Sequence, residues 1–406
     1  MFEAPTPRRN SLLRIAFGVC LLLLYSFAAA EDLDVALIQQ SIPSQVVTHL
    51  TVDININGNS RPMLLDTGAQ ITVLDPLFRP GISVEIERNN IHFLGGISRP
   101  TILHEGPPLK IGTTHFEKPA VIFHDMETFS RITGRPLAGM LGMDLIANNK
   151  IFLCFEKSYL AIHSGRWILD NQNFQEVELK RPIGTPVFDS NIAGHPVTFG
   201  IDTGYNGSIL LIASVFQKLV LEGIIEESNI NVRTITPGGE ISVKRGWFQS
   251  GRLMGKELIG ISVMSDPKTS RLGLTWLYAF NTEIDFSGRK FRYQTRANAS
   301  PPIDVQMMMG CMLTYDAKGA HVESLRPGGG TAENTGLKQG DVIESFGSLT
   351  AKELNAASIG NAVANGAGND IKILFLRKGD GKHIETRFHL PPAISQWDFA
   401  GRSLIK

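Results

Sequence analysis

The chain has 406 residues, which is enough for two or three domains. With 43% hydrophobic and 19% charged residues it has the composition of a globular protein that fills its own cores. The formal net charge is zero, so the charge balance gives no reason to expect nucleic acid or an anionic membrane surface as a partner.

The first thirty residues predict an export signal. Arg8 and Arg9 lie in a basic leader, residues 15–27 form an apolar run, and Ala28-Ala29-Ala30 offers small residues for cleavage before Glu31. The apolar run is shorter than the ~20 residues that span a bilayer comfortably. We therefore expect a signal peptide over residues 1–30 and an exported protein, periplasmic or secreted. An uncleaved membrane anchor is the alternative.

The remaining cysteines and the histidines give no sign of a metal site. Cys154 and Cys311 are the cysteines beyond the predicted signal, and they fall in different predicted domains. The histidines are scattered without the spacing of metal ligands, and the cysteines do not form a disulfide framework. The sequence therefore predicts a fold that is stabilised by its hydrophobic cores, with no metal and no organic cofactor.

Two Asp-Thr-Gly triplets lie in matching local settings. They are Asp66-Thr67-Gly68 and Asp202-Thr203-Gly204, and each directly follows an apolar strand. A turn glycine, Gly58 or Gly194, precedes each aspartate by the same offset. An acidic residue at the end of an apolar strand is a poor core residue. Its repetition in one frame indicates two copies of a single unit.

The matched order continues beyond the triplets. Each copy has a Gly-Gly hairpin tip, Gly95-Gly96 in the first and Gly238-Gly239 in the second. An apolar residue and a glycine follow, at Leu141-Gly142 and Leu272-Gly273, and then one short helix and a closing hairpin. Short strands separated by glycine turns predict a mainly β fold in both copies.

Two carboxylates that face each other can activate water. Crowded carboxylates cannot both ionise, so Asp66 and Asp202 would share one proton. One would act as general base on water and the other as general acid on a carbonyl. Thr67 and Thr203 could hydrogen-bond across to the opposite loop, and Gly68 and Gly204 would leave the backbone close to the carboxylates and free in φ. A single triplet would more simply be a β-turn; two in matched frames favour the paired site.

With these motifs the chain resembles the pepsin superfamily, and most closely the retropepsin-like aspartic proteases of bacteria with two fused lobes. The resemblance covers about residues 45–293. It implies two β-barrel lobes related by pseudo-twofold symmetry, catalytic Asp66 and Asp202, and flaps at both Gly-Gly hairpins. Tyr205 follows the second triplet where the family has small residues. It is expected either to alter the second loop or to lean into the cleft and contact substrate.

The tail resembles a PDZ domain, a small α+β fold. Residues 336–343 match that family's Gly-Leu-x-x-Gly-Asp-x-Ile turn. The resemblance implies a peptide-binding loop at Gly310-Cys311-Met312-Leu313, where backbone N–H groups would receive a peptide C-terminus. The alternative is a structural glycine turn with an unused groove.

The expected organisation is a signal peptide (1–30), lobe 1 (31–165), lobe 2 (166–298) and a PDZ domain (299–395). The function that the resemblance implies is an aspartic endopeptidase acting on a polypeptide, with the PDZ domain recruiting substrate or partner. A non-catalytic peptide-binding scaffold is the runner-up. One chain would hold both half-sites, so a monomer should suffice, although a dimer stays open.

Overall fold

The computed structural model describes residues 38–39, 49–81, 84–92, 94–112, 114–155, 159–163, 174–180, 184–228, 231–296, 309–325, 331–366 and 369–390. The predicted signal peptide and residues 297–308 lie outside these ranges. Within them, no helix has both the length and the apolar character needed to cross a membrane.

The first sheet holds the first triplet. Its strands are ordered β5-β6-β9-β4-β10-β3-β2-β7-β8. The elements, in chain order, are β2 (Thr51–Ile56), β3 (Asn59–Leu65), β4 (Val73–Leu74), η1 (Pro76–Phe78), β5 (Glu85–His92), η2 (Leu94–Gly96), β6 (Ser98–Glu105), β7 (Leu109–Ile111), β8 (Thr114–Phe116), β9 (Ala120–Phe123), α2 (Glu127–Thr133), β10 (Gly139–Leu141) and α3 (Met143–Ile146).

The second sheet holds the second triplet. Its strands are ordered β14-β15-β24-β16-β23-β20-β17. The elements are β14 (Val187–Ile192), β15 (His195–Ile201), β16 (Ile209–Ile212), α4 (Ala213–Leu221), β17 (Ile225–Glu227), β20 (Arg245–Phe248), β23 (Ser262–Asp266), β24 (Ser270–Leu272) and α5 (Leu274–Leu277), with the separate hairpins β18 (Val232–Thr236)–β19 (Gly239–Val243) and β21 (Arg252–Leu253)–β22 (Lys256–Glu257).

The two triplet strands are built alike. The turn before β3 has Asn57 and Gly58 at φ 51° and 83°, and the turn before β15 has Ala193 and Gly194 at φ 50° and 88°. Two successive positive φ values suit a tight hairpin whose twist matches its strands, which is why a glycine stands at the second place. β3 then pairs in parallel with β10, and β15 pairs in parallel with β24.

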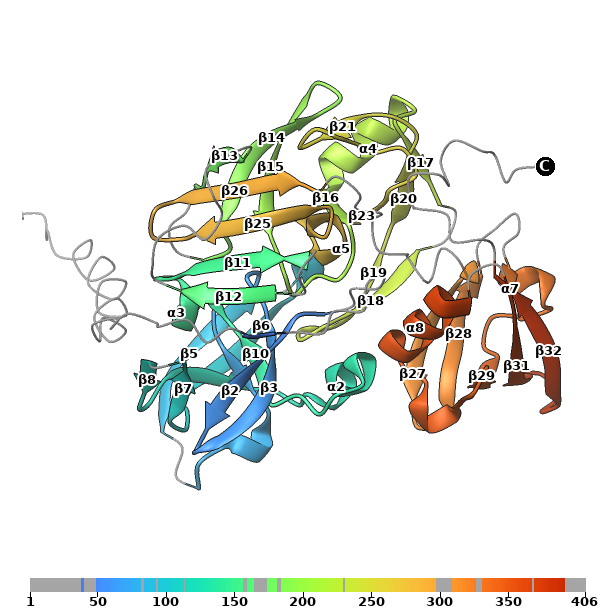
Figure 1. The fold of residues 1–406 in the computed structure, drawn as a ribbon, viewed down its shortest axis with the longest axis horizontal. Coiled ribbons are helices and arrows are strands. Elements are labelled where there is room, and N and C mark those ends of the chain that lie inside the picture. The colour runs from blue at the N-terminus through green and yellow to red at the C-terminus, as the bar shows by residue number, and fades with distance from the viewer. Residues whose placement is uncertain are drawn as a thin grey trace, which may run out of the picture.

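A central sheet joins the two halves, in the order β1-β12-β11-β25-β26-β13 (Figure 1). Its strands are β1 (Ile38–Gln39), β11 (Lys150–Cys154), β12 (Tyr159–His163), β13 (Gln175–Glu178), β25 (Phe280–Asp285) and β26 (Lys290–Thr295). The closing hairpins of both copies therefore lie side by side, with β11 against β25. One apolar core runs through all three sheets and includes Leu65, Leu153, Ile201 and Ile284.

The tail forms a further sheet with its own core, in the order β27-β28-β29-β31-β32, with β30 paired to β29. Its elements are β27 (Cys311–Asp316), β28 (Gly319–Leu325), α7 (Thr331–Asn334), β29 (Val342–Phe346), β30 (Leu349–Thr350), η4 (Ala351–Glu353), α8 (Ala356–Gly366), β31 (Asp370–Leu376) and β32 (His383–His389). α2 of the first sheet lies beside α8 and β27 in Figure 1.

The fold departs from the sequence expectations in its helices. Each copy was expected to hold one short helix, but α2 and α4 are additional to α3 and α5. The residue pattern also favours a helix over residues 351–363, but the structure divides this segment into η4 and α8, because Leu354 between them is extended (φ −73°, ψ 117°). Between the two copies the residue pattern favours a connector over residues 164–181, and this segment contributes β13 to the central sheet.

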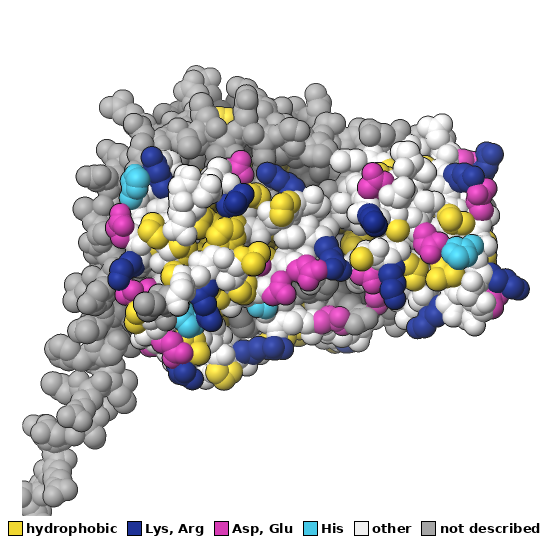
Figure 2. All heavy atoms as spheres, turned by 90° about the horizontal axis from the view of Figure 1, so that it is seen from below, with side chains coloured by type: hydrophobic (Ala, Val, Ile, Leu, Met, Phe, Trp, Pro, Cys, Tyr) yellow, Lys and Arg dark blue, Asp and Glu magenta, His cyan; other side chains and the backbone are white. Residues whose placement is uncertain are grey.

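On the face shown in Figure 2, the Lys and Arg side chains are interspersed with Asp and Glu side chains over the described residues. This face therefore carries no broad field of one sign, in keeping with the zero net charge of the chain.

Candidate active site

The two triplet loops meet and brace each other through reciprocal hydrogen bonds. The Thr67 hydroxyl donates to the Ile201 carbonyl at 2.7 Å, and the Thr203 hydroxyl donates to the Leu65 carbonyl at 2.7 Å. Each hydroxyl oxygen also accepts the backbone N–H of the opposite threonine, at 3.1 Å and 3.0 Å. Both threonines are buried, so all four bonds lie in a low-dielectric setting where losing one would be costly.

Each aspartate is oriented by its own loop. Asp66 Oδ1 accepts the N–H groups of Gly68 and Ala69 at 2.8 and 3.0 Å. Asp202 Oδ1 accepts those of Gly204 and Tyr205, both at 3.0 Å. In each carboxyl group one oxygen is thus fixed by two backbone donors, and the other oxygen accepts no backbone N–H group of its own loop.

Gly68 and Gly204 are required by space. A Cβ atom on Gly204 would lie 2.3 Å from Asp66 Cγ, and one on Gly68 would lie 2.5 Å from Asp202 Cγ. Each carboxyl group therefore packs against the glycine of the opposite loop. Neither glycine has a positive φ, so the expected freedom in φ is not what these positions use.

The Leu-Gly pairs lie directly behind the loops. The backbone N–H of Asp66 donates to the Leu141 carbonyl at 3.1 Å, and that of Asp202 donates to the Leu272 carbonyl at 3.0 Å. A Cβ on Gly142 would lie 2.6 Å from backbone at Ile71, and one on Gly273 would lie 2.2 Å from backbone at Gly207. Glycine at both places lets the following helix start immediately behind the carboxylates.

The halves differ in the residue before each Leu-Gly pair. In β10 this residue is Met140, which is buried in an apolar cluster with Leu64 and Leu103. In β24 it is Arg271, whose Nη1 lies 2.5 Å from Asp202 Oδ2. The sequence pattern indicated only an apolar residue and a glycine at this place, and the ion pair was not predicted. A charged residue where the first copy has methionine was the available clue.

The two aspartates also differ in exposure and electrostatics. Asp202 is 2% exposed, whereas Asp66 is only partly buried. Burial and the negative charge of Asp202 raise the pKa of Asp66 to about 7, against the opposing effect of Arg271 and of the loop's N–H groups. Near neutral pH the Asp66 carboxyl can therefore hold a proton, as a general acid must.

The first Gly-Gly tip is fastened to the opposite half. The N–H of Gly95 donates to Asp266 Oδ2 at 2.7 Å, and Asp266 Oδ1 accepts the N–H groups of Lys268 and Thr269, both at 2.8 Å. Gly95 and Gly96 have φ of 76° and 74°, which glycine adopts without strain. Asp266 was not singled out in the sequence, although an aspartate before Pro-Lys-Thr is typical of a side chain that caps a turn.

The second Gly-Gly tip reaches the first. A Cβ on Gly95 would lie 2.6 Å from Ile241 on β19, and one on Gly239 would lie 2.9 Å from the Arg99 guanidinium on β6. Gly239 takes φ 114°, and Gly238 lies in the same turn between β18 and β19. The hairpins β5–β6 and β18–β19 therefore touch each other.

Tyr205 neither distorts its loop nor leans out toward a ligand. Its side chain is 6% exposed and folds back over Gly207 and Gly273. Its carbonyl accepts the N–H of Leu274 at 2.7 Å, as the Ala69 carbonyl accepts that of Met143 at 2.9 Å. Both expectations for Tyr205 were thus wrong, because the small residues Gly207 and Gly273 leave a place for the ring behind the loop.

The remaining sequence-predicted site residues lie in the tail. Gly310, at φ 69°, directly precedes β27, and Cys311, Met312 and Leu313 form the start of that strand. β27 pairs with β28 and stands at the end of its sheet, so its other edge faces α2 and α8.

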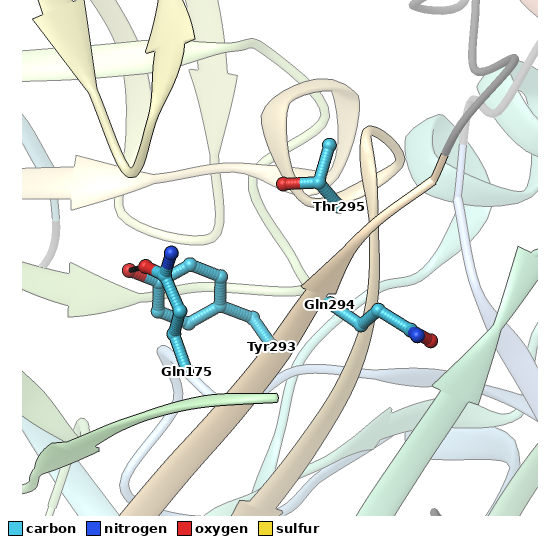
Figure 3. A pocket seen from close by; sticks show the side chains of 4 residues that line it. All are labelled: Gln175, Tyr293, Gln294 and Thr295. Carbon is cyan, nitrogen blue, oxygen red and sulfur yellow. Dashed lines mark hydrogen bonds between the residues drawn. The ribbon is translucent and has the colours of Figure 1, made fainter. Parts of the chain in front are cut away.

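A cavity of about 350 Å³ lies elsewhere, on the central sheet, and is lined by Gln175, Tyr293, Gln294 and Thr295 (Figure 3). The Tyr293 hydroxyl donates to Gln175 Oε1 at 2.5 Å within it. These residues come from β13 and β26, away from the triplet loops, so the cavity is separate from the paired aspartates.

A family model described as aspartyl protease matches residues 52–145. The matched segment contains the first triplet, the first Gly-Gly tip and Leu141-Gly142. No curated protein matches the chain. The match supports an aspartyl protease family, and hence a peptidase, on the evidence of this one segment within a mainly β chain.

Proposed function

We propose that the chain is an aspartic endopeptidase whose two half-sites are carried by two fused lobes. The observation that carries this proposal is the pairing of the loops. Thr67 and Thr203 exchange hydrogen bonds, and the Asp66 and Asp202 carboxyl groups pack against each other's loops. The family match to the first half supports the same conclusion.

The chemistry follows from one shared proton. The ionised carboxylate takes a proton from a water molecule as the water oxygen attacks the substrate carbonyl carbon, and the protonated carboxyl gives its proton to the carbonyl oxygen. The resulting tetrahedral diol then collapses. The C–N bond breaks as the nitrogen receives a proton from one carboxyl and the other regains its proton from a diol hydroxyl. No metal or organic cofactor is needed.

The two Gly-Gly hairpins act as flaps in this proposal. Their tips touch, and the Gly95 N–H is held by Asp266. A substrate would enter after this bond breaks and would lie extended beneath the hairpins, in a site from which water is excluded. Polypeptide is the proposed substrate because a site beneath two β-hairpins can bind the main chain of an extended peptide.

The outer segments complete the proposal. Residues 1–30 would be a signal peptide that directs the protein to the periplasm or outside the cell, followed by lobes at 31–165 and 166–298. The tail at 299–395 would be a PDZ domain that recruits a substrate or partner by its C-terminus, using residues 310–313 and the edge of β27 that pairs with no strand. A single chain would be active as a monomer.

The alternative, a non-catalytic peptide-binding scaffold, depended chiefly on the expectation that Tyr205 alters the geometry of the Asp202 loop. That loop holds Asp202 with the same pair of N–H donors as the first loop gives Asp66. The scaffold therefore has no specific observation in its favour.

The test is digestion of a diverse peptide library by the mature protein across a range of pH. Hydrolysis is expected for the wild type and not for Asp66→Asn or Asp202→Asn. Substantial hydrolysis by either purified variant contradicts the paired-carboxylate mechanism. Peptide binding by the wild type without any hydrolysis supports the scaffold.

A further inference from the structure

Arg271 makes the surroundings of the two carboxyl groups in the candidate site unequal. Its side chain is 16% exposed, and its Nη1 lies 2.5 Å from Asp202 Oδ2, the oxygen that accepts no backbone N–H group of the loop. A Cβ on Gly68 would lie 2.5 Å from Arg271 Nη1 as well as from Asp202. The cation therefore stands at the junction of the two loops.

The corresponding position in the first half carries no charge. Met140 occupies the same register in β10 that Arg271 occupies in β24, one residue before the leucine that accepts the aspartate N–H. Met140 packs among apolar side chains of the first sheet. Asp66 thus has no cation in the place where Asp202 has one, although the backbone around both is alike.

We propose that Arg271 is a positioning residue that holds the negative charge of the pair on Asp202 and leaves the shared proton on Asp66. The proposal rests on the proposed peptidase function and deepens it, because it assigns the two chemical roles. Asp202 is the base that takes the proton from water, and Asp66 is the acid that protonates the carbonyl oxygen. Bonds and protons balance as in the sequence of steps given above.

The electrostatics of the site agree with this assignment. Burial opposes the charge of Arg271, but the carboxylates of Asp202 and Asp66 outweigh burial and keep the pKa of the guanidinium raised. A close cation favours ionisation of the carboxylate that it contacts most directly. Asp202 is also the more buried aspartate, and a buried charge without a partner would be unfavourable.

The first experiment compares pH profiles of kcat/KM for the wild type, Arg271→Met, Arg271→Gln and Arg271→Lys. Met is the residue at the matching place in the first half, and Gln keeps length and polarity without charge. Loss of the cation is expected to move both limbs of the profile to higher pH, by about one unit or more, because the cation favours ionisation of both carboxyls. Arg271→Lys is expected to restore the wild-type limbs in part.

Arg292→Met is the matched control. The Arg292 side chain, on β26 of the central sheet, is 17% exposed, much like that of Arg271, and its Nε lies 2.6 Å from Oε2 of the more exposed Glu176. This variant should leave both limbs where they are. If Arg271→Met or Arg271→Gln lowers kcat with unmoved limbs, or has a higher kcat/KM than the wild type at its own optimum, the proposal is overturned.

A second measurement does not need turnover. Carboxyl ¹³C resonances of aspartate are titrated in the wild type and in Arg271→Gln, and are assigned with Asp66→Asn and Asp202→Asn. In the wild type the Asp66 resonance is expected to titrate near neutral pH, and in Arg271→Gln at higher pH. Unchanged titration rejects the role of Arg271. Should the wild type cleave no peptide yet titrate as expected, the peptidase proposal fails while the charge assignment stands.

Discussion

The Asp66 and Asp202 loops share one backbone but differ in their surroundings. Both carboxylates accept two loop N–H groups, both aspartates donate to a leucine carbonyl behind them, and both threonines cross to the other loop. Around this shared backbone, Asp66 is partly exposed, whereas Asp202 is buried against Arg271.

This difference shows which features a repeated unit must keep. The contacts that fix where the two carboxylates meet use the aspartate and threonine side chains and backbone groups of both loops, and both halves keep the Asp-Thr-Gly triplet that supplies them. The side chain before each Leu-Gly pair makes none of these contacts and was free to become Met140 in one half and Arg271 in the other. A pair that is symmetric in position can in this way become unequal in charge.

Replacing the aspartates should have the largest effect on activity and should show that their charge environments differ. Asp66→Asn and Asp202→Asn are each expected to lower peptide hydrolysis at least about 10²–10⁴-fold, since each removes one partner of acid–base catalysis. The two variants should differ in their free energy of unfolding. Asp202→Asn leaves Arg271 without its ion-pair partner and should cost about 3 kcal/mol of unfolding free energy. Asp66→Asn should be at least as stable as the wild type at pH 8, because it removes a carboxylate whose charge is opposed by burial and by Asp202.

Urea denaturation at pH 8 measures both variants, with Asp189→Asn as a control. Asp189 is an exposed partner of Lys180, and such pairs contribute little. Equal stability losses in Asp66→Asn and Asp202→Asn would contradict the unequal charge environments.

The threonines should instead behave alike, because their hydrogen bonds are reciprocal. Thr67→Val and Thr203→Val each remove a buried hydroxyl that donates to a carbonyl and accepts an N–H, at an expected cost of about 1–3 kcal/mol. The double variant should lose less than the sum, since each change already breaks bonds of the other loop. Denaturation of the two single variants and the double variant tests this. Serine at either position should keep most of the stability, and a large difference between the two valine variants would refute the reciprocity.

Much of the backbone structure around the two aspartates could be predicted from the sequence. From Val52 to Ile56 burial alternates as the residue pattern indicates, and the turns predicted at Gly58 and Gly194 are present, with positive φ at both glycines. Both Gly-Gly segments are hairpin tips. These features are local, since a period of two or a required positive φ can be read from a few neighbouring residues.

The features that sequence analysis missed depend on contacts between distant residues. Arg271 meets Asp202 across 69 positions, and Gly95 meets Asp266 across 171. Nothing near Asp266 in the sequence indicates a hairpin tip from the other half. Tyr205 was misjudged for a related reason, because the space that receives its ring is made by Gly273 from a different strand connection.

The contact between Gly95 and Asp266 offers a further comparison, between the two hairpin tips. Asp266→Ala removes the acceptor of the Gly95 N–H, a bond to a charged group, so exchange of that amide hydrogen should accelerate about tenfold or more. The Gly239 amide at the second tip should change less. Hydrogen exchange followed by NMR measures both. Asp285→Ala, which removes a similar turn-capping carboxylate from the central sheet, is the control. Equal acceleration at both tips in Asp266→Ala would mean a general loosening and would contradict a specific anchor.

The pH dependence of stability tests the same comparison from the side of Asp66. The pKa of Asp66 is about 7, above its ordinary value of 3.8, so the folded protein binds this proton more tightly than the unfolded chain does. Its contribution to stability is therefore fully present below about pH 4 and is lost as the pH rises through about 7. In Asp66→Asn the unfolding free energy should fall less between pH 4 and pH 8 than in the wild type.

Asp144 supplies the control for that measurement. Burial raises its pKa to about 6, and it lies behind the first loop, where it accepts the Thr72 hydroxyl at 2.8 Å. Its contribution has the same sign as that of Asp66, so a slope should persist in Asp66→Asn and become flatter in the double variant with Asp144→Asn. If the slopes of the wild type and Asp66→Asn coincide, Asp66 does not hold a proton near neutral pH. The acid of the pair would then have to be Asp202, despite the guanidinium beside it.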